Sequence, residues 1–184
     1  MPIQTPICDF GKKAIPFELK STNNKIISLN DIKGENGTLI MFICNHCPYV
    51  KAITKEIIED CNELKKIGIN TVAICSNDFV NYPDDSFENM INFSNDNQFN
   101  FPYLQDETQE IAKAYDAVCT PDFFGYNKDL GLQYRGRLRE LKNFVPVKDG
   151  ESDLLKAMKQ IAETGEGPQN KIPSAGCGIK WKYD

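Results

Sequence analysis

The stretch TLIMFICNHCPY, residues 38–49, joins an apolar run to a segment with the pattern of a helix. The run from Thr38 to Ile43 favours β-structure and predicts a strand that is buried on both faces. Pro48 indicates the start of a helix, because proline in the first helical position loses no hydrogen bond. The apolar residues that follow lie on one helical stripe, and Gly68 is placed to end it after Ile67. The four residues between the two segments, CNHC, therefore form a strand-to-helix turn.

This turn is a place where a cysteine thiol becomes acidic. Backbone N–H groups at a helix N-terminus lack intrahelical partners, and the helix dipole places positive charge there. Both effects favour the thiolate, which is the form of cysteine that attacks disulfides and peroxides. We therefore interpret Cys47, directly before Pro48, as the reactive centre. His46, the single histidine of the chain, either tunes this thiol or transfers a proton, or is a plain solvated ring.

The composition is typical of a soluble globular protein, with 184 residues, 41% of them hydrophobic and 26% charged, and a mean hydropathy of −0.43. This length predicts one domain over residues 1–184. No apolar run reaches the ~20 residues of a membrane helix, and the start of the sequence lacks the basic and apolar regions of a secretory signal. The net charge of −5 disfavours nucleic acid as a partner. We therefore expect a cytoplasmic protein that binds neither a membrane nor nucleic acid.

Strand-like and helix-like segments alternate along the rest of the chain. With the segments above included, the predicted order is β-β-β-α-β-α-β-α-β-β-α. Strand–helix alternation in the middle requires parallel neighbours, and the closing hairpin adds antiparallel ones. The sequence therefore predicts an α/β fold with a mixed central sheet and helices on both faces. The other strands are expected at residues 17–19, 25–29, 69–75, 101–104, 122–126 and 132–136, and the other helices at 107–115, at 152–164 and within the polar stretch 77–100.

Seven cysteines are many for a chain without a visible export signal. In a reducing compartment, such cysteines are more often buried, metal-bound or catalytic than paired in a disulfide framework. Cys61 lies on the apolar stripe of the predicted helix, Cys75 lies inside a predicted strand, and Cys8 follows Ile7. These three are expected to be small buried hydrophobic residues.

Several blocks of the sequence carry a resemblance to a known family, and CNHCPYV and VCTPDFF are the specific ones. The chain resembles the thioredoxin-fold, peroxiredoxin-like family of redoxin (AhpC/TSA-like) domain proteins, and the match runs nearly from end to end. The resemblance implies a thioredoxin-like α/β/α sandwich with extra N-terminal strands and a mid-chain insertion. It also implies an antioxidant or oxidoreductase function. The blocks that match are DFGKKAIPFEL, ISLNDIKG, MFICNHCPYVKAI, FPYLQDETQEIAKAYDAVCTPDFF, YRGRL and GCGIKW.

Alignment to the thioredoxin pattern assigns the cysteines of the turn. It places Cys47 at the first cysteine of the usual dithiol motif and Val50 at the second, so that Cys44 lies upstream of the motif. Peroxiredoxins carry their peroxide-attacking cysteine at the position of Val50, and a threonine or serine at the position of Cys47. The resemblance therefore does not extend to the standard peroxidase constellation.

Pro121 matches the cis-proline loop that faces the active-site cysteine in thioredoxin-like proteins. In this resemblance the loop exposes the backbone of Thr120 to an extended substrate strand. Thr120 and Pro121 are therefore expected to position the substrate. Cys119, beside the loop, is expected to lie close to Cys47 in space.

Three cysteines compete for the role of the thiol that resolves oxidised Cys47. Cys44 is nearest to it in the sequence, and Cys119 adjoins the cis-proline loop. Cys177 lies between two glycines, which indicate a mobile or tightly turned segment. The sequence leaves the choice among the three open.

The leading functional hypothesis is a thiol oxidoreductase that needs neither a cofactor nor a metal. Cys47 attacks a disulfide or a peroxide, and a second cysteine or an external thiol releases the product. The expected partners are thiol, disulfide or peroxide substrates, with a homodimer left open. One alternative is copper or zinc binding through Cys44, His46 and Cys47, with Cys177 as a fourth ligand. Another is a non-enzymatic interaction module that holds a partner strand.

Overall fold

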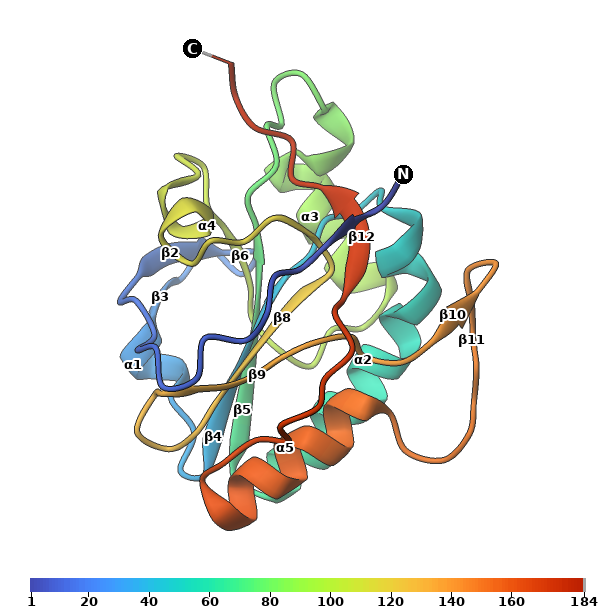
Figure 1. Ribbon diagram of the computed structural model, residues 1–184. Helices are drawn as coiled ribbons and strands as arrows, with labels where there is room; N and C mark the ends of the chain where they lie inside the picture. The colour runs from blue at the N-terminus through green and yellow to red at the C-terminus, as the bar shows by residue number, and fades with distance from the viewer. Residues whose placement is uncertain (184) are drawn as a thin grey trace.

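A computed structural model describes residues 1–183 of the chain. Its centre is a seven-stranded sheet in the order β3-β2-β6-β5-β4-β8-β9 (Figure 1). β4, β5 and β6 are parallel, whereas β8 and β9 on one side and β2 and β3 on the other add antiparallel pairs. The predicted mixed sheet is therefore confirmed. The strands are β1 (Ile3–Gln4), β2 (Glu18–Ser21), β3 (Ile26–Ser28), β4 (Gly37–Phe42), β5 (Ile69–Cys75), β6 (Tyr103–Gln105), β7 (Cys119–Thr120), β8 (Asp122–Tyr126), β9 (Leu132–Arg135), β10 (Leu141–Lys142), β11 (Val145–Pro146) and β12 (Ala175–Gly178), and the α-helices are α1 (Leu29–Ile32), α2 (Pro48–Lys66), α3 (Phe87–Asp96), α4 (Glu110–Ala114) and α5 (Asp153–Thr164).

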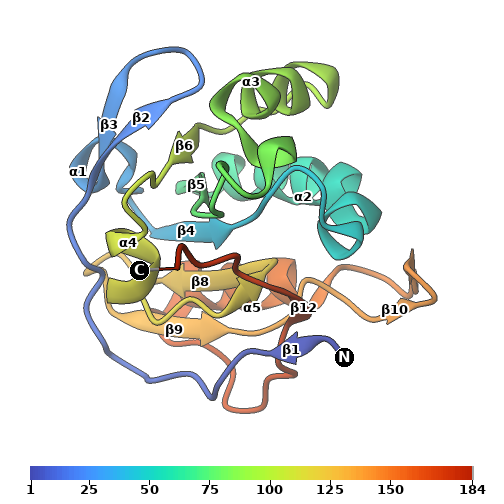
Figure 2. The same cartoon turned by 90° about the horizontal axis from the view of Figure 1, so that it is seen from above.

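Helices cover both faces of the sheet, as predicted (Figure 2). One face packs against α2, α3 and α5, and the other packs against α1, α4 and the N-terminal segment. Alternate side chains of β4 pack into the hydrophobic cores on the two faces of the sheet, because successive side chains of a strand point to opposite faces. Leu39 and Met41 belong to the first core, and Ile40 and Phe42 to the second. Within residues 1–183, no helix has both the length and the apolar character needed to cross a membrane.

The predicted strand-to-helix unit forms as expected. Every residue of β4 is buried, as in a central strand covered on both faces. Pro48 lies in the first turn of α2, and the helix ends before Gly68, whose φ of +80° favours glycine. This unit places Cys47 at the N-cap of α2.

The N-terminal hairpin differs from its predicted bounds. β3 covers residues 26–28 instead of 25–29, because Ser28 begins α1. The Ser28 side chain accepts a hydrogen bond from the backbone N–H of Asp31, and the Ser28 N–H donates to the Asp31 carboxylate at 2.8 Å. A four-residue helix has no periodicity that the sequence analysis could detect.

Two further elements are shifted from the prediction. α4 covers residues 110–114 instead of 107–115, because Gln109 before it has a left-handed backbone with φ +65°. The Asp106 carboxylate accepts a hydrogen bond from the N–H of Ala112 at 2.9 Å and so fixes the first turn of α4. β6 covers residues 103–105 instead of 101–104.

A second sheet, in the order β1-β12-β7, was not predicted. It joins the N-terminal and C-terminal segments to the residues before Pro121. Figure 1 shows β1 and β12 side by side next to the first turns of α2. Strands of two to four residues carry too little alternation to be recognised in a sequence.

Candidate functional site

Cys47 is the first residue of the site, and it lies at the N-cap of α2. Its side chain is 0% exposed, because the Thr120 loop and β12 lie over it. The contacts of this buried sulfur therefore decide its chemistry.

Hydrogen-bond donors around the Cys47 sulfur lower its pKa to about 5. The largest contribution is the hydrogen bond from the Cys44 thiol, and burial acts in the opposite direction. The Thr120 hydroxyl and the backbone N–H groups of Cys177 and Val50 add to the lowering. The Thr120 carbonyl oxygen, 3.2 Å from Sγ, accepts a hydrogen bond from the protonated form. The donors outweigh this contact, so Cys47 is a thiolate at neutral pH.

Cys44 keeps its proton when Cys47 ionises. The hydrogen bond to Cys47, burial and the charge of Asp85 raise the pKa of Cys44 well above its ordinary value. Its Sγ also lies 3.4 Å from Oγ1 of Thr120. The two sulfurs therefore form a pair in which one thiol donates to one thiolate.

The loop before β8 faces this pair of sulfurs. The peptide bond between Thr120 and Pro121 is cis, as the family resemblance implies. Asp122 holds the loop from inside, since its carboxylate accepts hydrogen bonds from the Val118 N–H at 3.2 Å and from the Arg135 guanidinium at 2.8 Å. Arg135 is 6% exposed, so a buried ion pair fixes the loop.

Asp85 is the residue of the site that the sequence analysis missed. It ends a 3-10 helix, Pro83–Asp85, in the mid-chain insertion and is 1% exposed. Its carboxylate accepts hydrogen bonds from the backbone N–H of Asn45 and from the side chain of Asn77, each at 2.8 Å. The acidic pair Asp84-Asp85 gave no sign of burial in the sequence, and only the fold brings Asp85 to the CNHC turn.

His46 is paired with Asp85 and not with Cys47. Its Nδ1 lies 2.7 Å from Oδ2 of Asp85. Cys44 Sγ, His46 Nδ1 and an Asp85 carboxylate oxygen all lie within 4.8 Å of one another. Among the residues described, the structure therefore gathers a different set of metal-ligating groups from the one predicted, which combined Cys44 and His46 with Cys47 and Cys177.

The two remaining candidate cysteines lie on paired strands next to Cys47. Cys177 in β12 stands opposite Thr120 of β7. Burial and the hydrogen bond to Cys47 raise the pKa of Cys177 to about 11. Cys119 is 0% exposed, and burial raises its pKa further. All four candidate cysteines are thus brought together, and only Cys47 has a lowered pKa.

Two expectations about this region are wrong. The segment around Cys177 is a paired strand and not a mobile loop. Gly176 makes this possible, because a Cβ at that position would overlap the Thr120 carbonyl group. The backbone of Thr120 is also not open to a substrate strand, since β12 occupies that edge and Thr120 is 2% exposed.

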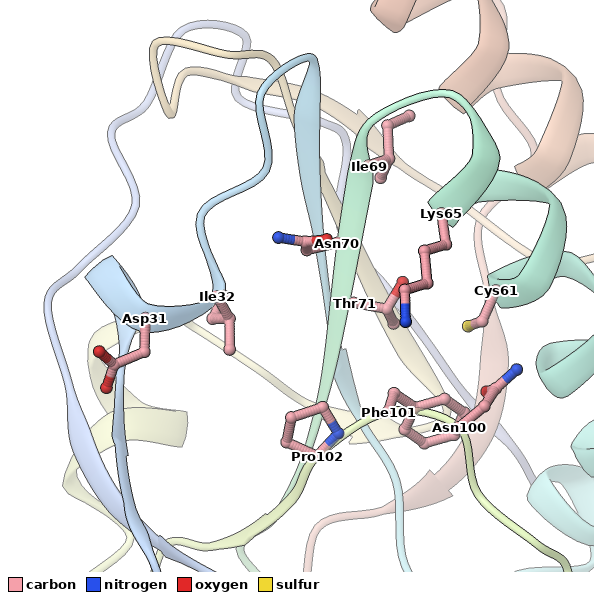
Figure 3. A pocket seen from close by; sticks show the side chains of 10 residues that line it. All are labelled: Asp31, Ile32, Cys61, Lys65, Ile69, Asn70, Thr71, Asn100, Phe101 and Pro102. Carbon is pink, nitrogen blue, oxygen red and sulfur yellow. The ribbon is translucent and has the colours of Figure 1, made fainter.

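The three cysteines predicted to be structural are buried: Cys8, Cys61 and Cys75. Figure 3 shows Cys61 in the wall of a cavity of about 210 Å³, together with Thr71 and Phe101. This cavity lies at the start of β5, at the opposite end of the sheet from the CNHC turn. Burial raises the pKa of Cys61 to about 12. The cavity of Figure 3 therefore contains no activated thiol.

A second cleft, of about 240 Å³, adjoins the cis-proline loop. Tyr49 of α2, Pro121 of the loop and Ala175 of β12 line it. The cleft therefore lies beside the covered Cys47.

Two solved structures resemble the whole chain. An uncharacterized conserved protein from Geobacillus kaustophilus is 40% identical, with a TM-score of 0.94 over 100% of this chain and 98% of its own. A hypothetical protein from Sinorhizobium meliloti 1021 is 30% identical, with a TM-score of 0.90 over 98% of this chain and 99% of its own.

A more distant structure identifies the fold, and a family model identifies the family. The thioredoxin domain of a thiol-disulfide oxidoreductase from Bacteroides vulgatus is 15% identical, with a TM-score of 0.59 over 71% of this chain and 89% of its own, so it shares the fold. No curated protein matches the chain. The family model described as AhpC/TSA family matches residues 10–140. The fold is therefore thioredoxin-like, and the chain belongs to the AhpC/TSA family.

Proposed function

We propose that the protein is a thiol oxidoreductase in which the Cys47 thiolate is the nucleophile. One observation carries this proposal: a buried sulfur at a helix N-cap accepts hydrogen bonds from the Cys44 thiol and from backbone N–H groups, which lower its pKa. Burial raises the pKa of Cys61 and Cys75, to about 12 in each case. Membership of the AhpC/TSA family supports a redox role.

The proposed reaction transfers oxidation from the substrate to Cys47. The thiolate attacks one sulfur of a disulfide, forms a mixed disulfide and releases the other half as a thiolate. With a peroxide, it would form a sulfenic acid and release an alkoxide or hydroxide. Once Cys47 is in the mixed disulfide, the loss of its charge removes the largest cause of the raised pKa of the neighbouring Cys44 thiol, which can then protonate the leaving group. A second thiol then attacks Cys47 and is itself oxidised, so that turnover consumes an external thiol.

A disulfide is the substrate class that we favour over a peroxide. Val50 stands where peroxiredoxins have their peroxide-attacking cysteine, and Cys47 where they have a threonine or serine. The arrangement around Cys47, with a neighbouring thiol as donor, instead provides what thiol–disulfide exchange needs: a stabilised thiolate and a nearby proton.

Turnover of a small disulfide and of hydrogen peroxide, each with a dithiol as reductant, tests this proposal. We expect Cys47→Ser to abolish turnover while its circular dichroism stays that of the wild type. Cys8→Ala is the matched control, since Cys8 is a buried thiol of the opposite core, and it should retain turnover. Unchanged turnover in Cys47→Ser would contradict the proposal.

A second candidate function is the binding of a zinc or copper ion. The cluster of Cys44, His46 and Asp85 offers soft and borderline ligands in one place. The distance of 2.7 Å between His46 Nδ1 and Asp85 Oδ2 disfavours it, because two ligand atoms of a tetrahedral zinc ion are roughly 3.3 Å apart. Metal analysis of protein purified without chelator tests whether this cluster binds a metal ion. A stoichiometric metal content that is lost in His46→Ala supports the metal site, and metal-free protein contradicts it.

A further inference from the structure

The edge of β7 beside the reactive sulfur is filled by the chain's own C-terminal segment. β12 pairs antiparallel with β7, with Cys177 opposite Thr120, and it pairs with β1 on its other side. Figure 1 shows this segment next to the first turns of α2, where Cys47 lies. Cys47 is 0% exposed with β12 in this place. An extended protein substrate therefore meets β12 before it meets Cys47.

Hydrogen bonds hold the C-terminal segment in this position. The Ser174 hydroxyl donates to the Pro121 carbonyl oxygen at 2.8 Å, and Ser174 and Thr5 exchange two hydrogen bonds. Beyond β12, the Gln109 side chain donates to the Lys180 carbonyl oxygen at 2.8 Å and accepts from the Lys182 N–H at 2.9 Å. The segment is thus a built part of the site and not a loose tail.

β12 brings a second sulfur into contact with Cys47. Cys177 stands opposite Thr120, whose carbonyl oxygen lies 3.2 Å from the Cys47 sulfur, and the proximity of Cys47 contributes to the raised pKa of Cys177. Cys177 is only partly buried, whereas Cys44 is 1% exposed and Cys119 is 0% exposed. Among these three candidates, Cys177 alone combines contact with Cys47 and access to solvent.

Cys44 also adjoins Cys47, but it is 1% exposed. The turn that carries it is held at Asn45, which donates its backbone N–H to Asp85 and accepts a hydrogen bond from the Tyr103 hydroxyl at 2.8 Å. The hydrogen bond to Cys47, burial and the Asp85 charge raise the pKa of Cys44 well above its ordinary value, further than that of Cys177. A thiol that keeps its proton is a poor nucleophile, so Cys44 is less suited than Cys177 to attack oxidised Cys47.

We propose that Cys177 is the thiol that resolves Cys47, and that the two form a disulfide within one chain. This inference rests on the proposed function, because it requires a Cys47 that reacts with an oxidant. β12 takes the place of a substrate strand and supplies the second sulfur from the chain itself. The oxidant is then a small disulfide that enters beside the cis-proline loop, because protein strands are kept from β7.

The steps balance as two thiol–disulfide exchanges. The Cys47 thiolate attacks the small disulfide, so one sulfur–sulfur bond forms, another breaks, and one small thiolate leaves. Loss of the Cys47 charge removes a cause of the raised pKa of Cys177, which then gives up its proton to the departing thiolate or to water. The Cys177 thiolate attacks Cys47, and the second small thiolate leaves. The disulfide is reduced to two thiols, and two protein thiols are oxidised.

A stoichiometric titration with 2,2′-dithiodipyridine tests this inference, because each exchange releases one coloured thiopyridone. We expect wild type to release two equivalents per chain in the fast phase and to yield a Cys47–Cys177 peptide pair in mass spectrometry. Cys177→Ser should release one equivalent and keep a mixed disulfide on Cys47. The matched control Cys8→Ala should release two.

The outcomes separate the two proposals. Two fast equivalents from Cys177→Ser, or a disulfide that joins Cys47 to Cys44 or Cys119, would overturn the role of Cys177 and leave the proposed function intact. A wild type without any fast release at Cys47 would overturn the proposed function, and the role of Cys177 with it.

Discussion

Two buried cysteines on the same helix have opposite acidities. Cys47, at the N-cap of α2, is 0% exposed, and its pKa is lowered to about 5. Cys61, about four turns further along, is 5% exposed, and its pKa is raised to about 12. Burial is common to both, so burial alone does not decide which thiol is acidic. The difference lies in their surroundings: several hydrogen-bond donors lower the pKa of Cys47, whereas burial dominates at Cys61 and raises its pKa.

The largest effect on this contrast is expected from Cys44→Ala. The variant removes the main donor to Cys47, so the Cys47 pKa should rise towards the ordinary value of 9.0. A rise of one unit lowers the thiolate fraction at pH 6 from about 90% to about 50%, a full return to 9.0 lowers it to about 0.1%, and we expect a rise of at least about one unit. Stopped-flow rates with a small disulfide at pH 6 and pH 9 measure it, with Cys8→Ala as control. Equal rates for Cys44→Ala and wild type at pH 6 would show that Cys44 does not activate Cys47.

The pH dependence of stability should differ in sign between the two cysteines. The folded pKa of Cys47 lies below its unfolded value, so its contribution is complete above about pH 9 and is lost as pH falls to about 5. Unfolding free energies of wild type minus Cys47→Ser should therefore rise over this range, by at most about 1.4 kcal/mol per pH unit. Denaturant unfolding of reduced protein measures the difference.

Cys61 supplies the internal comparison for that experiment. Its folded pKa is raised, so ionisation of the unfolded chain costs stability only as pH rises above about 9. The unfolding free energy of wild type minus that of Cys61→Val should be constant below this pH and should fall above it. Two curves of the same shape would contradict the assigned difference between the cysteines.

Loosening the C-terminal segment should change the access of reagents to Cys47 more than it changes the pKa of the Cys47 thiol. Gln109→Ala removes the hydrogen bonds to Lys180 and Lys182, so β12 should open more often. We expect a bulky maleimide to label Cys47 several-fold faster, with a small change in its pKa, because the Cys44 thiol, the main donor, stays in place. Gln160→Ala, on the outer surface of α5, is the matched control. Labelling at the wild-type rate in Gln109→Ala would show that the segment does not limit access.

The smallest effect is expected from Cys61→Val. A volume-conserving apolar replacement in a core costs less than about 1.5 kcal/mol. The rate of Cys47 with a small disulfide should stay at the wild-type value, because Cys61 lies at the other end of the sheet (Figure 3). A slower reaction in a variant that remains folded would mean that the two ends of α2 are coupled.

Much of the fold was predictable because its signals are local. The apolar run of β4, Pro48 and the stripe of α2 identify the strand-to-helix unit from about thirty consecutive residues, and Cys47 follows from its place in that unit. α5 likewise forms where its apolar stripe predicted it, between Ser152 at its N-cap and Gly165 at its C-cap. These elements need no knowledge of distant partners.

The rest of the site depends on distant pairing, which local patterns do not encode. Asp85 reaches Asn45 across 40 positions of the chain, and its burial is a product of the fold. Cys177 meets Thr120 through two strands that are too short to show alternation. The glycines beside Cys177 indicate a mobile or tightly turned segment in the sequence, but in the structure Gly176 allows the close approach of two backbones.

The central claim is that Cys47 is a stabilised thiolate while the other cysteines are not. Ultraviolet absorbance of the thiolate, titrated for wild type and for Cys47→Ser, tests it directly, because absorbance does not require a reagent to reach a covered sulfur. We expect a difference curve with a midpoint at pH about 5. A midpoint near the ordinary thiol value of 9.0 would contradict it, because Cys47 would then be a buried thiol like Cys61.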